Sequence, residues 1–147
     1  MENDVSLASV KGVELTGSGC AVFIGPEDKT FIIYVDQFLG NAILMALKSE
    51  MNERPFTHDL IGSILLGLGV TLERVIINDV SNDTFFARII LKMENELGSK
   101  VMELDARPSD SIVLALQAKK PIYVSQRVLD TTIDVTETLK KIRKKEN

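Results

Sequence analysis

Two short segments of this 147-residue chain share a pattern that suits anion binding. Arg54-Pro55-Phe56-Thr57-His58-Asp59 and Arg107-Pro108-Ser109-Asp110 each run from an arginine and a proline to a hydroxyl residue and an aspartate. Proline holds the preceding residue in extended backbone, so each arginine should stand away from the helix that follows. Unpaired N–H groups at a helix start, with an arginine beside them, suit a phosphate or a carboxylate. The candidate phosphate-binding residues here are Arg54, Thr57, Arg107 and Ser109.

The same segments also fit simple helix capping. Thr57 is a natural N-cap residue, and Asp59 and Asp110 would lie in first turns, where a carboxylate stabilises a helix by about 0.3–1 kcal/mol. Pro108 suits the first turn of a helix as well. Capping does not require the arginine that occurs in both segments. The anion-binding and the capping interpretations therefore both stay open.

His58 is the single histidine, and it could act as a general acid or base near neutral pH if a carboxylate orients it. Asp59 cannot be that carboxylate, because adjacent residues of a helix do not face each other. A packing or capping role is the alternative for His58. The candidate catalytic residues are His58, Asp59, Asp105 and Asp110.

Three carboxylates lie within eight residues, where a predicted strand ends and a helix begins. They are Glu103, Asp105 and Asp110. Side chains alternate along a strand, so Glu103 and Asp105 should share one face and could hold Mg²⁺ or Mn²⁺ together with Asp110. Such spacing also arises by chance in a chain with 21 acidic residues.

The charge balance limits how this protein could meet nucleic acid. The chain has 17 basic and 21 acidic residues, a formal charge of −4, which argues against binding duplex DNA through overall positive charge. Residues 140–147 carry +4 and residues 1–139 carry −8, so the only dense basic cluster is the tail. Cys20 is the single cysteine, which excludes an internal disulfide and a cysteine-rich zinc site. No P-loop or nucleophile-elbow motif is present.

The hydrophobic pattern predicts strands and helices in a repeated order. We expect strands at 10–15, 20–24, 30–35, 72–78, 84–91, 100–104 and 121–124, and helices at 38–50, 57–66, 109–118 and 133–145. Three strands followed by a helix occur at residues 10–50, and the same order occurs again at residues 72–118. An ungapped offset of 69 residues, which places Asp36 on Asp105, favours an internal duplication. It would also make Asp36 a further, weaker candidate ligand.

These elements predict an α+β fold in one domain, with an antiparallel sheet made from a duplicated β-β-β-α unit and helices packed on one face. Residues 1–135 would form the domain and residues 136–147 a basic tail or helix. Exposed edges of such a sheet invite pairing, so a homo-oligomer is expected. No targeting signal is visible, and the longest apolar stretch, residues 60–70, is about half a membrane span. We expect a soluble, cytoplasmic protein that has no membrane partner.

Taken together, these segments resemble the bifunctional nuclease (BFN) domain family over roughly residues 8–135. The likeness is strongest at residues 54–60 and 105–111, and it extends to residues 73–79, 84–88 and 121–124. The resemblance implies a small, oligomeric α+β domain whose members are credited with cleaving DNA and RNA. It also adds Arg88 to the phosphate-binding candidates. The family usually carries a glutamate where this chain has Leu39, so a catalytic role of that glutamate would pass to Asp36 or be lost.

Our leading hypothesis is a metal-assisted phosphodiesterase that acts on nucleic acid with little sequence preference. Asp105, Asp110 and Glu103 would hold Mg²⁺ or Mn²⁺, and the arginines would clamp the phosphate. The alternatives are a non-enzymatic oligomeric binding or regulatory module whose Arg-Pro motifs are structural, and a binder of a small phosphorylated or carboxylated ligand.

Overall fold

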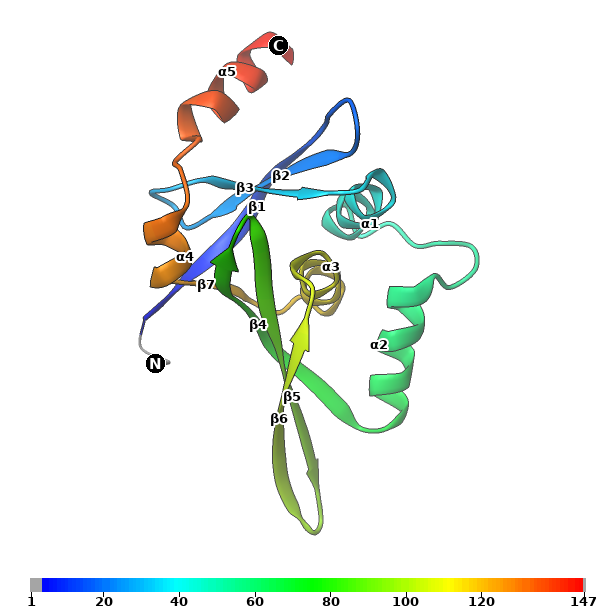
Figure 1. Ribbon diagram of the computed structural model, residues 1–147. Coiled ribbons are helices and arrows are strands. Elements are labelled where there is room, and N and C mark those ends of the chain that lie inside the picture. Colours follow the sequence, from blue (N-terminus) through cyan, green and yellow to red (C-terminus); the bar gives the residue numbers. More distant parts are fainter. Residues whose placement is uncertain (1–3, 147) are drawn as a thin grey trace.

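One seven-stranded sheet with five helices makes up the protein, in a computed structural model that describes residues 4–146 (Figure 1). The strands are β1 (Val5–Leu15), β2 (Cys20–Gly25), β3 (Phe31–Val35), β4 (Val70–Ser81), β5 (Thr84–Asn95), β6 (Gly98–Ala106) and β7 (Ile122–Ser125). The helices are α1 (Gln37–Leu47), α2 (Thr57–Gly67), α3 (Pro108–Ala118), α4 (Gln126–Thr131) and α5 (Thr136–Glu146). The predicted α+β class is confirmed.

The sheet is mixed, whereas an antiparallel sheet was predicted. Its strand order is β3-β2-β1-β7-β4-β5-β6, so two meanders run outward from a centre that β7 occupies. β7 pairs antiparallel with β1 and parallel with β4. A parallel partner requires a crossover connection, and β5, β6 and α3 separate β4 from β7 along the chain. This long-range pairing also explains why β1 begins at Val5 rather than at the predicted residue 10, because Val5–Ala8 lie against β7.

The two halves share an element order, but their strand-to-helix junctions differ. Asp36 caps α1, since its Oδ1 accepts a hydrogen bond from the Leu39 N–H at 2.8 Å. The offset of 69 residues would give Asp105 the same role, yet Asp105 lies inside β6, and Arg107 is the N-cap residue of α3. The internal duplication therefore stays a prediction.

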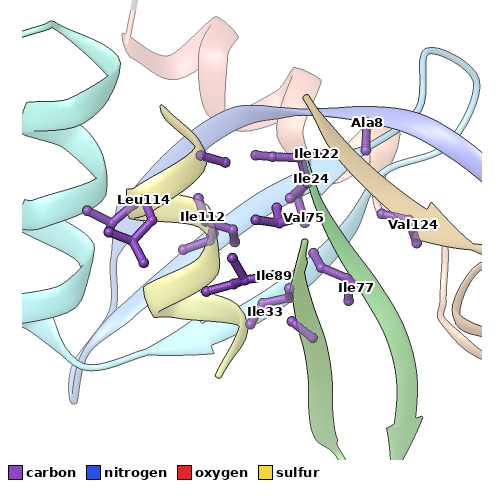
Figure 2. Packing of buried hydrophobic residues seen from close by; sticks show 14 of the residues in the cluster. Ala8, Ile24, Ile33, Val75, Ile77, Ile89, Ile112, Leu114, Ile122 and Val124 are labelled. Carbon is purple, nitrogen blue, oxygen red and sulfur yellow. The ribbon is translucent and has the colours of Figure 1, made fainter. Parts of the chain in front are cut away.

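The main core lies between the sheet and α3. Buried aliphatic side chains of β4 and β5, among them Val75, Ile77 and Ile89, pack against Ile112 and Leu114 of α3 (Figure 2). The helix predicted at 109–118 is present as α3, and its apolar residues 112 to 115 are all buried.

A second, smaller cluster covers the opposite face of β2. Leu139 of α5 packs there against Ala21 and Phe23. The predicted terminal helix is thus present, starting at Thr136. The short helix α4 was not predicted; Ser125 caps it by accepting a hydrogen bond from Val128 N–H at 3.3 Å. Within residues 4–146, no helix has the length and apolar character needed to cross a membrane.

Candidate active site at the start of α3

The first turn of α2 lies against one face of α3, and two hydrogen bonds fix the contact. Nε2 of His58 is 2.8 Å from Oδ1 of Asp110, and Nε2 of Gln117 donates to Oδ1 of Asp59 at 3.1 Å. Asp110 and Gln117 are seven residues apart, so they share a face of the helix. The two Arg-Pro segments, which are 53 residues apart in sequence, therefore meet through His58 and Asp110.

Asp59 helps to start α2, and it also borders a hollow of about 510 Å³ that residues of α1, α2 and α3 line. Its Oδ2 accepts hydrogen bonds from the backbone N–H of Phe56 at 2.8 Å and from Nδ2 of Asn52 at 2.9 Å. The Phe56 N–H, followed by the Asn52 amide, lowers the pKa of Asp59 below its ordinary value. Phe56 is the N-cap residue, so the prediction that Thr57 caps α2 is wrong; Thr57 is the exposed first residue of the helix. The Asp59 carboxylate, at the third position of the helix, accepts from the N–H of the N-cap residue, which is one of the two bonds of a capping box.

In the His58–Asp110 pair, the histidine is the inner member. The His58 side chain is 9% exposed, whereas that of Asp110 is 41% exposed. When Asp110 is ionised it can only accept, so Nε2 of His58 carries the hydrogen in this bond. The group that can meet a substrate is therefore the Asp110 carboxylate, with the imidazole holding it from behind.

The start of α3 has no side-chain cap. Arg107 occupies the N-cap position with extended backbone, and Pro108 follows at the first helical position. Helix geometry leaves the N–H groups of Ser109 and Asp110 without an intrahelical partner. Arg107 is exposed and forms no ion pair with any residue between 4 and 146. Its guanidinium is thus available to an anion beside these N–H groups.

Arg107 and Ser109 line a hollow of about 660 Å³. β3, the β4–β5 turn and the segment between α4 and α5 form the rest of its wall. Its polar lining includes Asn82, Thr84 and Thr131, and its apolar floor includes the stacked rings of Phe31 and Phe85, 5.8 Å between centroids. This volume falls in the range of ligand sites. These additional lining residues were not predicted as site residues, because they come from four elements that only the fold brings together.

The three predicted metal ligands do not form one centre. Leu104 pairs with Ile89 of the core, so the alternation of β6 turns Glu103 and Asp105 to the opposite face of the sheet. Asp110 lies on the α3 side. Among residues 4–146 there is no group of three or more His, Cys, Asp or Glu side chains that could hold a metal ion. These residues do not fit a three-ligand metal site.

The remaining candidates are also distributed over several places. Arg88 lies on β5 directly opposite Asp105, on the sheet face away from α3. Arg54 is exposed in the loop before α2 and has no ion pair within the described part of the chain. Asp36 is used as a cap, and Leu39 is buried at 9% exposure, so neither offers a group to this site.

The chain is similar to a known domain family and to individual proteins of a bacterium and a plant. The profile of the bifunctional nuclease domain matches residues 22–136. An uncharacterised protein of Mycobacterium tuberculosis (strain H37Rv) is 35% identical over 102 residues, which are 69% of this chain and 58% of that protein. Bifunctional nuclease 1 of Oryza sativa subsp. japonica is 30% identical over 87 residues, 58% of this chain and 26% of the rice protein. The chain therefore spans about three-fifths of the mycobacterial relative and about a quarter of the rice one. Because the profile covers most of the sequence, the chain belongs to the bifunctional nuclease domain family.

Proposed function

We propose that the protein hydrolyses phosphodiester bonds of DNA and RNA, with little sequence preference, at the start of α3. The observation that carries this proposal is a half-exposed carboxylate, Asp110, held by a buried histidine at the same helix start that presents an unpaired arginine. Membership in a nuclease family supports the reaction type.

In this proposal the phosphate lies beside the α3 terminus. Arg107 and the N–H groups of Ser109 and Asp110 bind its oxygens, where the helix dipole also favours negative charge. The Asp110 carboxylate takes a proton from the attacking water, and the leaving oxygen departs with a proton from solvent. General base catalysis of this kind contributes about 10²–10⁴-fold to a rate. His58 then acts as a positioning residue.

The groups proposed here to bind the strand are Arg107 and backbone N–H groups, which suit phosphate oxygens; this supports weak sequence preference. The body of the chain is acidic, so a bound strand would meet positive charge only at local groups, such as Arg107, Arg54 and the basic helix α5. Contacts to phosphate position a strand without reading its sequence.

A labelled-oligonucleotide assay tests the proposal. Single-stranded RNA and DNA are incubated with wild type, Arg107→Ala and Asp110→Asn, each with Mg²⁺, with Mn²⁺ and with a chelator. We expect cleavage by wild type and at least a 100-fold loss in each variant. Lys100→Ala, which removes one exposed positive charge near the far end of β6, should retain full activity. Unchanged cleavage by both Arg107→Ala and Asp110→Asn would refute this site.

A second candidate is a non-enzymatic binding or regulatory module. The observation in its favour is that the His58–Asp110 and Asp59–Gln117 bonds both join α2 to α3, so part of each motif has a structural role. In that case wild type would not cleave either nucleic acid under any metal condition, and Asp110→Asn would alter only thermal stability.

A further inference from the structure

Two exposed phenylalanine rings, one at the start of α1 and one at the start of α2, stack on each other beside a hollow. The rings of Phe38 and Phe56 lie 6.3 Å apart between centroids, with 28° between their planes. The two residues are 66% and 48% exposed. A hollow of about 410 Å³ opens beside them, and its wall includes Ala42 and Met45. The pair is therefore stacked but open, so a further planar group can lie on a free ring face.

This aromatic pair lies near the proposed site at the start of α3. Val35 lines the same hollow as Arg107, and Phe38 is three residues further along the chain, which spans at most about 11 Å. Phe56 precedes His58 by two residues, at most about 7 Å, and His58 is bonded to the first turn of α3. The starts of α1 and α2 thus both lie beside the start of α3. A strand with a phosphate there can reach the rings with a neighbouring nucleotide.

The charges around the rings favour a base on the rings and a phosphate at their rim. Lys48 and Glu50 both line the hollow, and their opposite signs leave it without a net charge. Arg54, two residues before Phe56, is exposed and forms no ion pair with any residue between 4 and 146. A nucleobase has flat π faces and a polar edge. Its face suits the rings, its edge can bond to Asn41 or Lys48 of the hollow, and Arg54 can meet the phosphate next to it.

Stacking supplies affinity that does not depend on the overall charge of the protein, which is negative. Every base has a π face, so an aromatic platform accepts all of them. The side-chain amide of Asn41 carries both donors and an acceptor, so it can bond to either kind of group on a base edge. In a duplex, neighbouring pairs cover the faces of each base. A platform of this kind therefore accepts unpaired bases and reads little sequence.

We propose that the Phe38–Phe56 pair is a stacking subsite for an unpaired nucleobase, next to a phosphate bound at the start of α3. Phe38 is the more exposed member and supplies the free ring face, while Phe56 supports it from behind. This inference rests on the proposed nuclease function, because that function places the strand at α3. It adds a preference for single strands over duplexes.

Fluorescence anisotropy with two labelled strands of equal length tests the subsite. Both strands carry phosphorothioate linkages, which resist cleavage; one has bases and the other is abasic throughout. We expect wild type to bind the strand with bases at least about fivefold more tightly than the abasic strand. Phe38→Leu keeps an apolar side chain without a ring and should lose most of this difference, whereas Phe38→Trp should keep it. Phe86→Leu, at an exposed phenylalanine of β5 that lines neither hollow, should bind like wild type.

The outcomes separate this subsite from the proposed reaction. Because the strands are not cleaved, a base-dependent affinity that Phe38→Leu abolishes supports the subsite even if wild type cleaves no nucleic acid. Equal binding of the two strands by wild type, or binding of neither, overturns the subsite whether or not cleavage occurs. A Phe38→Leu variant that keeps the full difference overturns it as well. A duplex of the same sequence should bind equally to wild type and Phe38→Leu, and a similar loss of duplex binding would contradict a site for unpaired bases.

Discussion

The imidazole of His58 and the carboxylate of Asp110, 2.8 Å apart, join the starts of two helices, and the carboxylate is the member that faces solvent. In the familiar arrangement of a histidine and an aspartate, the aspartate is the inner group and the histidine meets the substrate. Here the order of burial is reversed. The roles expected of the two residues are reversed with it.

Substitutions in this pair should therefore have different effects. Asp110→Asn keeps an oxygen that can accept from His58, so we expect near-native stability and a loss of cleavage of about 10²–10⁴-fold. His58→Ala leaves a buried space and an unpaired carboxylate, so we expect the free energy of unfolding to fall by about 1–3 kcal/mol, together with a partial loss of activity. Urea denaturation and the cleavage assay measure the two effects. The two cleavage rates are compared under conditions in which both variants are folded to the same extent. A larger loss in His58→Ala than in Asp110→Asn would show that His58 is the reacting group.

Asp59 should make the free energy of unfolding depend on pH in the acidic range. Its pKa is lowered in the folded protein, chiefly by the Phe56 N–H, so its stabilising effect is present above the ordinary carboxyl range and is lost as the pH falls through the lowered value. Asp59→Asn should lower the free energy of unfolding by about 0.5–2 kcal/mol at neutral pH and reduce the difference between neutral and acidic pH. Urea midpoints from pH 7 to pH 3 test this. Parallel curves for wild type and variant would contradict it.

Replacing Gly40 and Gly62 with alanine should change the stability of the protein in opposite directions. A methyl group on Gly40 of α1 would lie 2.7 Å from Cβ of Cys20 and closer still to its sulfur, whereas a methyl group on Gly62 of α2 would meet open space. We expect Gly40→Ala to cost about 1–3 kcal/mol through overpacking. Gly62→Ala should increase stability by about 0.5–1 kcal/mol, since alanine favours a helix. Thermal melting compares them. Adding Cys20→Gly to Gly40→Ala should restore part of the lost stability, because it removes the side chain that the new methyl group meets. The same change added to Gly62→Ala should have no such effect.

The helix α5 should behave as part of the folded domain although the predicted domain ended at residue 135. Leu139 is buried against Phe23, and the Thr30 carbonyl accepts a hydrogen bond from Val135 N–H at 2.7 Å. Leu139→Ala should cost about 2–5 kcal/mol, and the exposed neighbouring change Thr138→Ala should have little effect. Chemical denaturation distinguishes them. Equal stability of both variants would support a tail that does not contribute to the domain.

The sequence allowed most elements to be predicted, because their signals are local. The break at Arg107-Pro108, followed by an apolar segment, indicated α3. The Asn82-Asp83 turn between β4 and β5 has the positive φ angles, 50° and 62°, of a two-residue hairpin. The place of β7 in the strand order of the sheet could not be predicted, because a strand of four residues carries no information about which distant strands it will pair with. Its parallel pairing with β4 made the sheet mixed.

The candidate site was predictable only in part for the same reason. The motif residues His58 and Asp110 were identified from their types and neighbours, but their contact depends on how α2 crosses α3. Glu103 and Asp105 do not lie with Asp110, because these two residues of β6 project from the sheet face opposite to the one on which α3 packs. Closeness in sequence across such a junction does not place side chains together.

The position of β7 at the centre of the sheet has a consequence for how the chain is made. The meanders β1–β2–β3 and β4–β5–β6 are joined in the sheet only through this strand, which pairs Val5 with Ser125. During synthesis, the inner edges of β1 and β4 remain without their neighbour until residues 122–125 have been translated. Non-local pairing of this kind is slow, and unpaired strand edges are prone to aggregation. Each meander can form early on its own, but the complete sheet closes only after β7 has been made.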